Sequence, residues 1–383
     1  MRKGAAAFLL LVPLGTAPAQ NAPSEQLWKL SGYYLNLFSR STTIFPEGEG
    51  ERYVLDLNRL RLKVEGKAFK ALSVDVQYDN ELLLCDYLRT RQFALIKDRV
   101  PDTSLDLEST YGDGRSAVGR HRIYRAVVSW SGEDTRISIG RQRIAWGTGR
   151  FWSPLDVLNP FDAVRLERDI RPGVDAVLVD RTLGPLGKLD MAYAPATEHA
   201  DAAAAAYVHG NARGTDYSVL VGTFRGERMV GADFSASLGG LGIRGEATAS
   251  RPDTGRSFAR VLLGADYGFA NTLTLTAELY FNGQGSADRT RYDVAGLFEG
   301  RIRSLARRYG AIAASYEMTP LFKVVVYGIV NVDDRSRLIW PGLEYSLASS
   351  IDIGGGVQYF SGSSGSEYGR FRDVRYLQAR WFF

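Results

Sequence analysis

Apolar and polar residues alternate with a period of two along most of this chain. In the stretch 272–282, positions 273, 275, 277, 279 and 281 are apolar, and the residues between them are threonine, glutamate, tyrosine or asparagine. The same alternation recurs at 68–79, 228–238 and 259–269. Such a pattern predicts β-strands with one apolar and one wet face. The sequence therefore predicts an all-β fold.

Eighteen segments carry this pattern. They span 28–38, 53–65, 68–79, 120–130, 135–145, 173–181, 187–194, 201–209, 214–224, 228–238, 241–250, 259–269, 272–282, 307–318, 321–332, 337–347, 350–360 and 372–383. Most of them reach the length that a tilted β-strand needs to cross a bilayer. Pro341 lies inside one segment and removes a ladder donor, so a β-bulge is expected there.

The connections between these segments alternate in length. Tight turns such as 239–240 and 270–271 are followed by longer connections at 39–52, 80–119, 146–172, 251–258, 283–306 and 361–371. Short periplasmic turns and long external loops are typical of outer-membrane barrels. We predict a transmembrane antiparallel up-and-down β-barrel of eighteen strands, with sixteen as the alternative count. An even count places both termini in the periplasm.

Two other all-β architectures were weighed against the barrel. Strands of a soluble β-sandwich average about five or six residues, and its turns do not sort by side. A solenoid or propeller would show a sequence repeat, and none is found. Closure into a barrel also leaves no unpaired strand edge in lipid. No stretch after the N-terminal segment has the eighteen unbroken apolar residues of a transmembrane helix.

The N-terminal segment has the features of a cleaved signal peptide. Arg2 and Lys3 form a basic start, residues 5–12 are a short apolar run, and 17–19 read Ala-Pro-Ala before Gln20. An uncleaved anchor or a buried helix is the alternative. We expect residues 1–19 to be the signal peptide and 20–383 to be a single outer-membrane barrel domain, with long external loops at 80–119, 146–172 and 283–306.

The last residues carry a more specific signal. Leu377, Ala379, Trp381 and Phe383 alternate onto one face, and phenylalanine is the final residue. This resembles the C-terminal strand signal that the outer-membrane insertion machinery reads in bacterial barrels. The plainer interpretation is a final strand that ends in aromatic residues. Together with the signal peptide, the pattern predicts a multi-pass barrel in the bacterial outer membrane.

One stretch carries a family resemblance. Residues 140–147 read Gly-Arg-Gln-Arg-Ile-Ala-Trp-Gly, and residues 151–162 read Phe-Trp-Ser-Pro-Leu-Asp-Val-Leu-Asn-Pro-Phe-Asp. A strand that ends in Gly-Arg-Gln, followed by Trp-Gly and a loop with Asn-Pro-x-Asp, is similar to the phosphate-selective (O and P type) porins and their uncharacterised relatives. The resemblance implies a channel for solute diffusion. The three-lysine cluster expected of a phosphate-specific porin is not apparent.

This stretch also has the composition of a loop that folds inward and narrows a pore. Its aromatic residues offer packing surface, its prolines stiffen the path, and its charges have both signs. The candidate constriction residues are Arg141, Arg143, Trp146, Arg150, Asp156, Asn159, Asp162 and Arg165. Strict alternation would aim Arg141 and Arg143 at lipid, so either Gly140 forms a bulge or both lie at the outer rim. An ordinary external loop is the alternative.

Alternation also predicts which charged residues face the lumen. Leu60, Leu62 and Val64 are assigned to lipid, which turns the intervening residues inward. The candidate pore-lining residues are Arg59, Arg61, Lys63, Glu65, Asp75, Gln77, Asp79, Arg244, Glu246, Glu278 and Arg380. Opposite charges across a lumen tune ion selectivity. The alternative is that these charges only pair with one another and fill the lumen.

Composition excludes several classes of function. One cysteine and three histidines leave no disulfide framework or Cys-rich metal site, so we expect no metal and no cofactor. A net charge of +4 does not indicate a nucleic-acid partner. No histidine has an assignable nucleophile partner, so we expect no enzyme.

The most favoured function is a porin-like channel for passive diffusion of small hydrophilic solutes or ions, with a slight preference for anions. Arginines 289, 291, 301, 303, 307 and 308 concentrate positive charge at one external loop, and we expect them to attract anions or lipopolysaccharide phosphates. A genomic base composition that favours arginine codons is the alternative. Expected partners are outer-membrane lipid, lipopolysaccharide, the insertion machinery and small solutes, with a homotrimer as one arrangement. The alternative is a conduit or sheath for a partner, such as a multihaem cytochrome, or a gated export channel.

Overall fold

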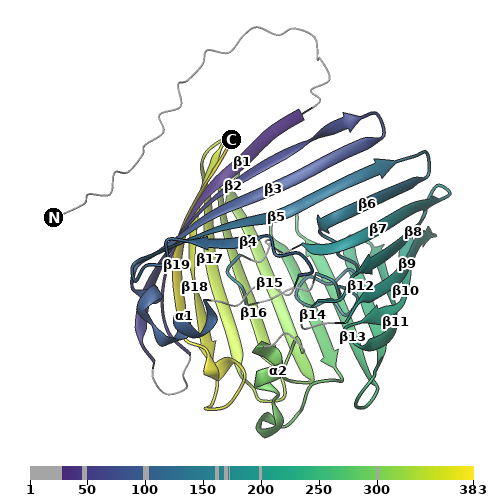
Figure 1. Cartoon of the computed structure of the whole chain (residues 1–383). Helices are drawn as coiled ribbons and strands as arrows, with labels where there is room; N and C mark the ends of the chain where they lie inside the picture. Colours follow the sequence, from purple (N-terminus) through teal and green to yellow (C-terminus); the bar gives the residue numbers. More distant parts are fainter. Residues whose placement is uncertain are drawn as a thin grey trace.

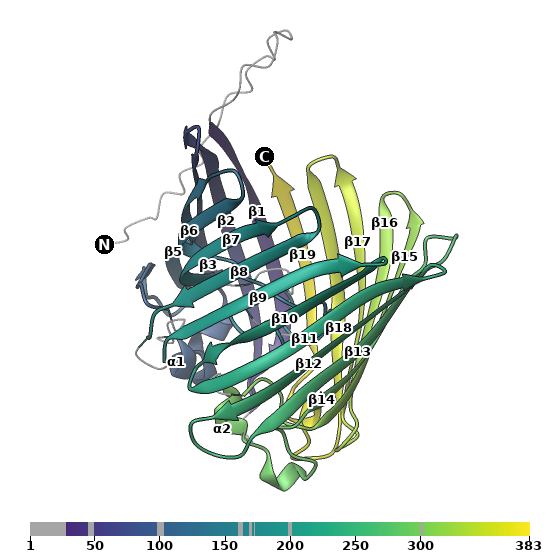
Figure 2. The same cartoon turned by 90° about the vertical axis from the view of Figure 1, so that its right-hand side faces the viewer.

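The computed structural model describes residues 28–44, 50–97, 103–159, 164–167, 171, 173–197, 201–298 and 302–383. Antiparallel strands follow one another around a single closed wall (Figure 1, Figure 2). The wall closes because β1 pairs with β2 on one side and with β19 on the other. Of the nineteen strands described, eighteen form the wall and β4 is a short addition. This confirms the predicted fold class and strand number.

The strands are long, and several extend beyond their predicted ends. Their bounds are β1 (Trp28–Thr42), β2 (Arg52–Phe69), β3 (Leu72–Leu84), β4 (Glu108–Tyr111), β5 (Ala117–Ser131), β6 (Thr135–Gln142), β7 (Val174–Leu183), β8 (Gly187–Ala194), β9 (Ala203–Ala212), β10 (Thr215–Phe224), β11 (Glu227–Leu238), β12 (Leu241–Pro252), β13 (Phe258–Gly268), β14 (Thr274–Asn282), β15 (Arg308–Thr319), β16 (Phe322–Asn331), β17 (Arg337–Ala348), β18 (Ile351–Ser361) and β19 (Val374–Phe382).

The helices are short and lie in loops. They are α1 (Arg91–Ile96), α2 (Val294–Phe298) and the 3₁₀ turns Asp86–Arg89, Arg289–Arg291 and Tyr368–Arg370. In the described part of the chain, no helix has both the length and the hydrophobicity to cross a membrane.

The two ends of the barrel differ. At one end, which we call the short-turn end, brief connections such as 70–71, 239–240 and 349–350 join the strands. Phe383 lies there too, and its amide donates to Gly32 of β1. At the other, the long-loop end, the connections include 85–116, 143–173 and 283–307, with α1 and α2 among them (Figure 1).

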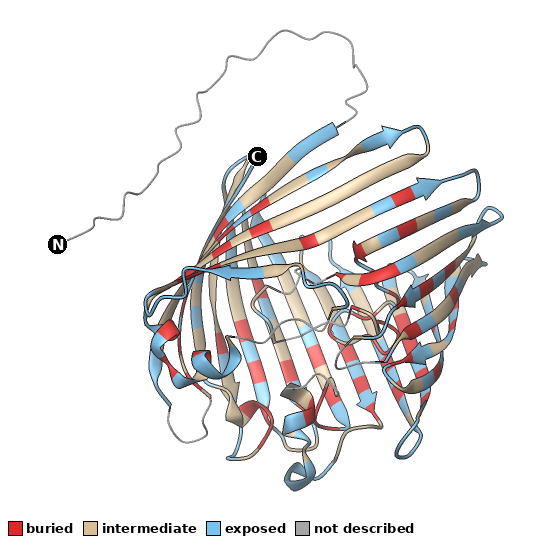
Figure 3. Ribbon diagram, viewed as in Figure 1, coloured by how far each residue is buried: buried red, intermediate tan, exposed pale blue. Residues whose placement is uncertain are grey.

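Side chains alternate between the outer face and the lumen. Along β11, Val230, Phe234 and Leu238 are exposed on the outer face, whereas Asp233 is buried on the inner face. Figure 3 shows the same banding of buried and exposed positions on many strands. An apolar outer face and a polar inner face are what a barrel in lipid requires. The period-two pattern therefore has the predicted structural cause.

The bulge predicted at Pro341 is wrong, and of the two alternatives given for Arg141 and Arg143, a bulge at Gly140 does not hold. Pro341 pairs with Val326 in register, and the shift in β17 lies between Ser346 and Ala348 instead. Because proline lacks an N–H, residues 340 and 341 do not pair in the β17–β18 ladder. The ladder has the same register on both sides of this gap, so no extra residue is inserted there. Gly140 has a φ of 120°, yet the β5–β6 and β6–β7 ladders run through it without a register shift.

β6 ends earlier than predicted, and β4 takes its place beside β5. β6 pairs with β5 as far as Arg141 opposite Ala126. Beyond that point, β4 pairs with Gly119 to Arg122 of β5. The chain after Gln142 is therefore released from the wall, and the edge of β5 that it leaves is covered.

Candidate functional site: a loop folded across the barrel lumen

The chain that leaves β6 crosses the lumen and packs against both sides of the inner wall. On one side, Trp146 and Leu155 pack in a cluster with residues of β7 to β11, including Ala192 and Tyr207. On the other side, Phe151 packs in a cluster with residues of β15 to β17, including Leu338. Phe151 and Leu155 are almost completely buried. The described part of this loop folds inward, and we call residues 143–159, 164–167 and 171 the crossing loop. That it narrows a pore stays a prediction.

Glu246 of β12 holds the first part of the crossing loop. Its carboxylate accepts hydrogen bonds from the backbone N–H groups of Thr148 at 2.5 Å, Gly149 at 2.6 Å and Leu155 at 3.1 Å. The Ser153 hydroxyl donates to the same carboxylate at 2.9 Å. Charge-assisted hydrogen bonds of this kind are among the strongest in proteins. Glu246 is 2% exposed, so these donors replace the water that a carboxylate would otherwise hold.

Glu278 of β14 holds the next residues of the crossing loop. It accepts from the backbone N–H groups of Arg150 at 2.6 Å and Phe151 at 2.8 Å. The Arg244 guanidinium donates to Glu278 at 3.1 Å and also binds Asp266. Glu246 and Glu278 were predicted to line the lumen. They do face it, and each anchors the backbone of the crossing loop.

Three further contacts fix the second part of the loop. The Asn159 side chain accepts from the Ile144 amide at 2.7 Å, which closes the loop on itself. Arg171 donates to the Asp156 carboxylate at 2.5 Å. Arg303, which comes from the 283–307 connection, donates to the carbonyl of Asp156 at 2.7 Å. Asp156 is 1% exposed, so its partners in the described chain neutralise a buried charge.

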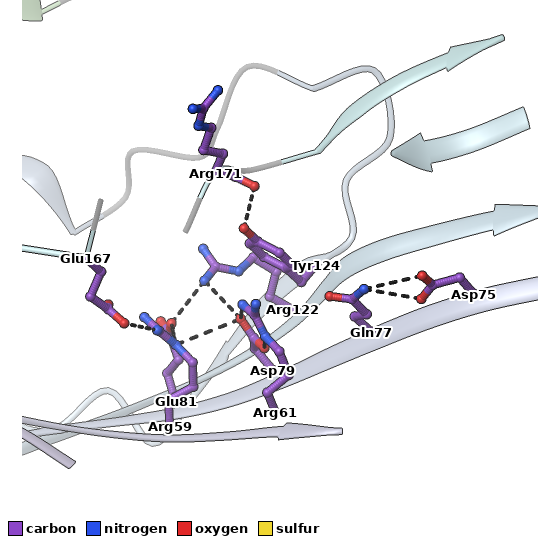
Figure 4. Close-up of polar contacts among 10 residues, drawn as sticks. All are labelled: Arg59, Arg61, Asp75, Gln77, Asp79, Glu81, Arg122, Tyr124, Glu167 and Arg171. Atoms are coloured by element: carbon purple, nitrogen blue, oxygen red, sulfur yellow. Dashed lines mark hydrogen bonds and ion pairs between the residues drawn. The ribbon is translucent and has the colours of Figure 1, made fainter. Parts of the chain in front are cut away.

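A network of ion pairs covers the inner face of β2, β3 and β5 (Figure 4). Arg61 forms a bidentate pair with Asp79, at 2.6 and 2.7 Å. Arg59 donates to Glu81 at 2.7 Å and to Glu167 of the crossing loop at 2.6 Å. The network therefore ties the crossing loop to a third part of the wall.

Two more residues complete this network. The Arg122 side chain bridges both carboxylates of β3, with an oxygen of Glu81 at 2.9 Å and one of Asp79 at 3.3 Å. The Tyr124 ring lies 3.6 Å from the Arg61 guanidinium, and its hydroxyl donates to the Arg171 carbonyl.

A cavity of about 390 Å³ lies between the crossing loop and the wall strands β11 to β13. Four arginines and two aspartates are its charged lining: Arg143, Arg150, Arg171, Arg244, Asp156 and Asp266. Arg143 and Arg150 are exposed, whereas Arg171 and Arg244 are buried beside carboxylates. The lining has more positive than negative groups, and Arg143 and Arg150 are its two exposed arginines.

Other predicted pore-lining residues lie on the inner face and form local pairs. Lys63 and Glu65 form an ion pair, and Gln77 donates to Asp75 at 3.2 Å. Arg380 of β19 lies 5.3 Å from the centre of the Tyr33 ring. All five residues lie nearer the short-turn end than the residues of the same strands that contact the crossing loop. Whether a solute passes them stays a prediction.

One predicted constriction residue, Arg141, lies outside the crossing loop. Arg141 belongs to β6, where it pairs with Asp175 at 2.9 Å and donates to the Leu105 carbonyl. Segment 103–107 covers it, so it faces neither lipid nor the constriction. Arg165 is an exposed residue of the crossing loop, and Asp162 lies outside the described residues.

A second connection folds into the mouth of the barrel at the long-loop end. Phe93 of α1 and the adjoining Leu88 are buried in a cluster with Leu55, Leu57 and Leu83. These wall residues are on the same face of β2 and β3 as Arg59 and Asp79. The connection between β3 and β5 therefore narrows the entrance as well as covering β5 with β4.

The predicted insertion signal has the expected face. Leu377 and Trp381 are exposed on the outer face of β19, which pairs with β1 to close the barrel. Phe383 is also exposed, and Ala379 is exposed on the same face as Leu377 and Trp381. Recognition of these residues by insertion machinery stays a prediction.

Several site residues were missed by sequence reasoning. Glu81 continues the alternation of Asp75 and Asp79, and was lost because the predicted strand stopped at 79. Arg122 lies on the inner face of a correctly placed strand but was not singled out. Arg303 was expected to attract anions at an external loop, but it donates to the carbonyls of Asp156 and Val157 in the crossing loop. Arg171 has no signal in the sequence, because its role depends on loop conformation. In the described residues, no group of three or more His, Cys, Asp or Glu side chains is placed to hold a metal ion.

Comparisons with known proteins identify the fold. No protein-family model matches the chain, and no curated protein matches its sequence. Among solved structures, Pseudomonas aeruginosa OpdK with vanillate aligns with a TM-score of 0.60 and 12% identity, over 93% of this chain and 98% of that one. Pseudomonas aeruginosa OccK5 (OpdH) aligns over the same shares with a TM-score of 0.61 and 11% identity.

A third neighbour is a porin. The BenF-like porin from Pseudomonas fluorescens Pf-5 aligns with a TM-score of 0.56 and 10% identity, over 93% of this chain and 98% of that chain. At these identities, the likeness shows a shared fold. The porin-like barrel architecture implied by the sequence resemblance is therefore confirmed. A specific relation to the phosphate-selective porins stays a prediction.

Proposed function

We propose that this chain is an outer-membrane channel through which small hydrophilic solutes diffuse passively past the crossing loop, with a preference for anions. The observation that carries the proposal is the cavity between the crossing loop and β11 to β13. Its volume of about 390 Å³ is in the range of small-molecule sites. A wide barrel narrowed by one anchored loop is suited to passing small solutes while it excludes larger ones.

The charges of the cavity support an anion preference. Arg143 and Arg150 are exposed into it, while Asp266 and Asp156 are each bound to a buried arginine. Guanidinium groups bind carboxylate and phosphate oxygens with good geometry. OpdK, which shares the fold, was solved with vanillate, a small organic anion. That observation belongs to OpdK, and it agrees with the class of solute proposed here.

The crossing loop weighs against a sheath for a partner protein. Trp146, Phe151 and Leu155 pack against opposite sides of the wall, so a threaded cytochrome would have to displace a packed core. An export channel with a removable plug would face the same cost. A passive channel needs no such displacement.

The membrane placement is part of the proposal. The apolar outer face, the aromatic C-terminal strand and the likeness to porin barrels support an outer-membrane location. We place the short-turn end, with both described chain ends, in the periplasm, and keep residues 1–19 as an expected signal peptide outside the described part of the chain.

The test is electrical recording from the purified, refolded chain in a planar bilayer under a salt gradient. We expect steady unitary current steps and a reversal potential that indicates anion preference. A barrel of verified fold that passes no current would contradict the channel. A cation-selective reversal potential would contradict only the anion preference.

A further inference from the structure

Four arginines point outward from the barrel wall at the long-loop end, where the apolar face stops. Arg40 of β1 and Arg375 of β19 are directly opposite each other in the β1–β19 ladder. Arg228 of β11 and Arg251 of β12 are directly opposite each other in the β11–β12 ladder. All four side chains are exposed.

These positions are on the outer face of their strands. Two residues toward the short-turn end from the first pair, Phe38 and Leu377 form the next outward pair, 43% and 66% exposed. The corresponding neighbours of the second pair are Val230, 55% exposed, and Ala249. Each arginine pair therefore marks the edge of the apolar band. A membrane's headgroup layer begins at that level.

Neither pair forms an ion pair in the described part of the chain, although Asp253 lies two residues beyond Arg251. Among the described residues, none of the four arginine side chains has a hydrogen bond or an ion pair with another residue, whereas their backbones pair in the ladders. The next outward neighbours of Arg40 and Arg375 across the sheet are Val54 and Val357, which offer no counter-charge. Like charges directly opposite in adjacent strands destabilise a sheet. An anion from outside the protein that binds between the two arginines of a pair would remove this repulsion.

The opposite ends of the same four strands carry no such charge. The outward residues there are apolar, namely Leu30, Leu238, Leu241 and Trp381. Because the outward arginines of these four strands lie at one end only, a general abundance of arginine in the chain does not explain them. It also distinguishes these residues from the arginines of the 283–307 connection, which lie in a loop beyond the strands.

We propose that the Arg40–Arg375 and Arg228–Arg251 pairs bind the phosphate groups of a phosphorylated lipid, of the lipid A type, in the leaflet at the long-loop end. Two adjacent guanidinium groups match the charge and the acceptor oxygens of a phosphate. The apolar residues below each pair contact the acyl chains of the same lipid. The proposal goes beyond solute passage, and rests only on the barrel lying in a membrane.

The test measures binding of bisphosphorylated lipid A in mixed micelles to the folded barrel by native mass spectrometry. The variants are R40Q/R375Q, R228Q/R251Q and the quadruple change. Folding is checked by the mobility difference between heated and unheated protein. The matched control is R181Q, because Arg181 is an exposed arginine near the short-turn end of β7. We expect each double change to weaken binding by at least about tenfold at low salt, and the control to leave it unchanged.

Three further arms identify the ligand. Lipid A without phosphates should bind the wild-type chain as weakly as bisphosphorylated lipid A binds the quadruple variant. Millimolar inorganic phosphate should not displace the lipid, because it lacks the acyl chains. The change R289Q/R291Q in the loop should have little effect. Equal lipid binding by wild type and quadruple variant, or a loss confined to the loop variant, would overturn the proposal. So would a quadruple variant that changes its oligomeric state and keeps its lipid affinity, because the pairs would then serve a second copy of the chain.

Discussion

Removal of the Glu246 carboxylate should release the crossing loop from the wall. In the change Glu246→Ala, the backbone N–H groups of Thr148, Gly149 and Leu155 lose their acceptor. The β12 strand itself keeps its backbone ladders to β11 and β13. The barrel should therefore fold, with the loop as the affected part.

The size of the effect follows from the hydrogen bonds. Each buried donor left without a partner costs about 1–3 kcal/mol, and water that enters beside the loop recovers part of this. A net loss of about 3 kcal/mol lowers the ratio of anchored to released loop by roughly two orders of magnitude. Glu246→Gln keeps one acceptor oxygen but turns an NH₂ group toward the Leu155 amide, so its effect should be intermediate.

Single-channel recording in a planar bilayer measures the release. Both variants should show larger unitary conductance and more current noise than wild type, in the order Ala above Gln. Limited proteolysis should cleave the crossing loop faster in the same order. The matched control is Glu344→Gln, since Glu344 is a half-exposed carboxylate on β17 that pairs with Lys323 at 3.6 Å. The anchoring account is refuted if Glu246→Ala folds and has the conductance and protease resistance of wild type.

Three further predictions concern charge, pH and the wall. The double change Arg143→Gln and Arg150→Gln should move the reversal potential toward cation preference, because it removes the two exposed cations of the cavity; unchanged selectivity would place the passage elsewhere. Burial raises the pKa of Glu367, at the long-loop end, to about 7. The folded state therefore binds this proton more tightly than the unfolded state does. The stability that this group contributes is full below about pH 4.5 and is lost as the pH rises through 7. Glu367→Gln, which can still accept from Tyr309 and Asn331, should remove that decline in thermal midpoint between pH 5 and 8; parallel curves for the two proteins would count against it. Arg141→Ala should destabilise the barrel by about 3–5 kcal/mol in urea unfolding, since it leaves Asp175 buried without its cation, and a loss below about 1 kcal/mol would show that water replaces it.

The wall of the barrel was predictable because a strand in lipid leaves a local signal. Every second residue must be apolar, whatever the rest of the chain does. That rule placed Glu246 and Glu278 on the inner face correctly. The ends of strands were less predictable. β3 continues to Leu84, five residues past its predicted end, because its backbone still pairs with the neighbouring strands beyond the apolar band. β4 has only four residues and pairs on one side, too little to produce a periodic pattern.

The work done by the inward residues was not predictable from alternation. Glu246 and Glu278 were expected to face solute, yet they bind loop backbone that is about 100 residues distant in sequence, such as Gly149 from Glu246. Every residue except proline has a backbone N–H group, so no side-chain pattern indicates which of these groups will donate to a given carboxylate. The loop aromatics did indicate packing, and Trp146 and Phe151 are indeed buried. Which wall each would contact depended on the path of the whole loop.

The central claim is that solutes pass the crossing loop beside Arg143. The most direct measurement is the change Arg143→Cys in a background where Cys85, the chain's single cysteine, is replaced by serine. A bulky negatively charged thiol reagent is added during single-channel recording, with Arg291→Cys, an exposed loop residue, as the control. The account predicts a stepwise fall in current on modification of position 143 and little change for position 291. Complete modification at position 143 with the current unaltered would contradict it.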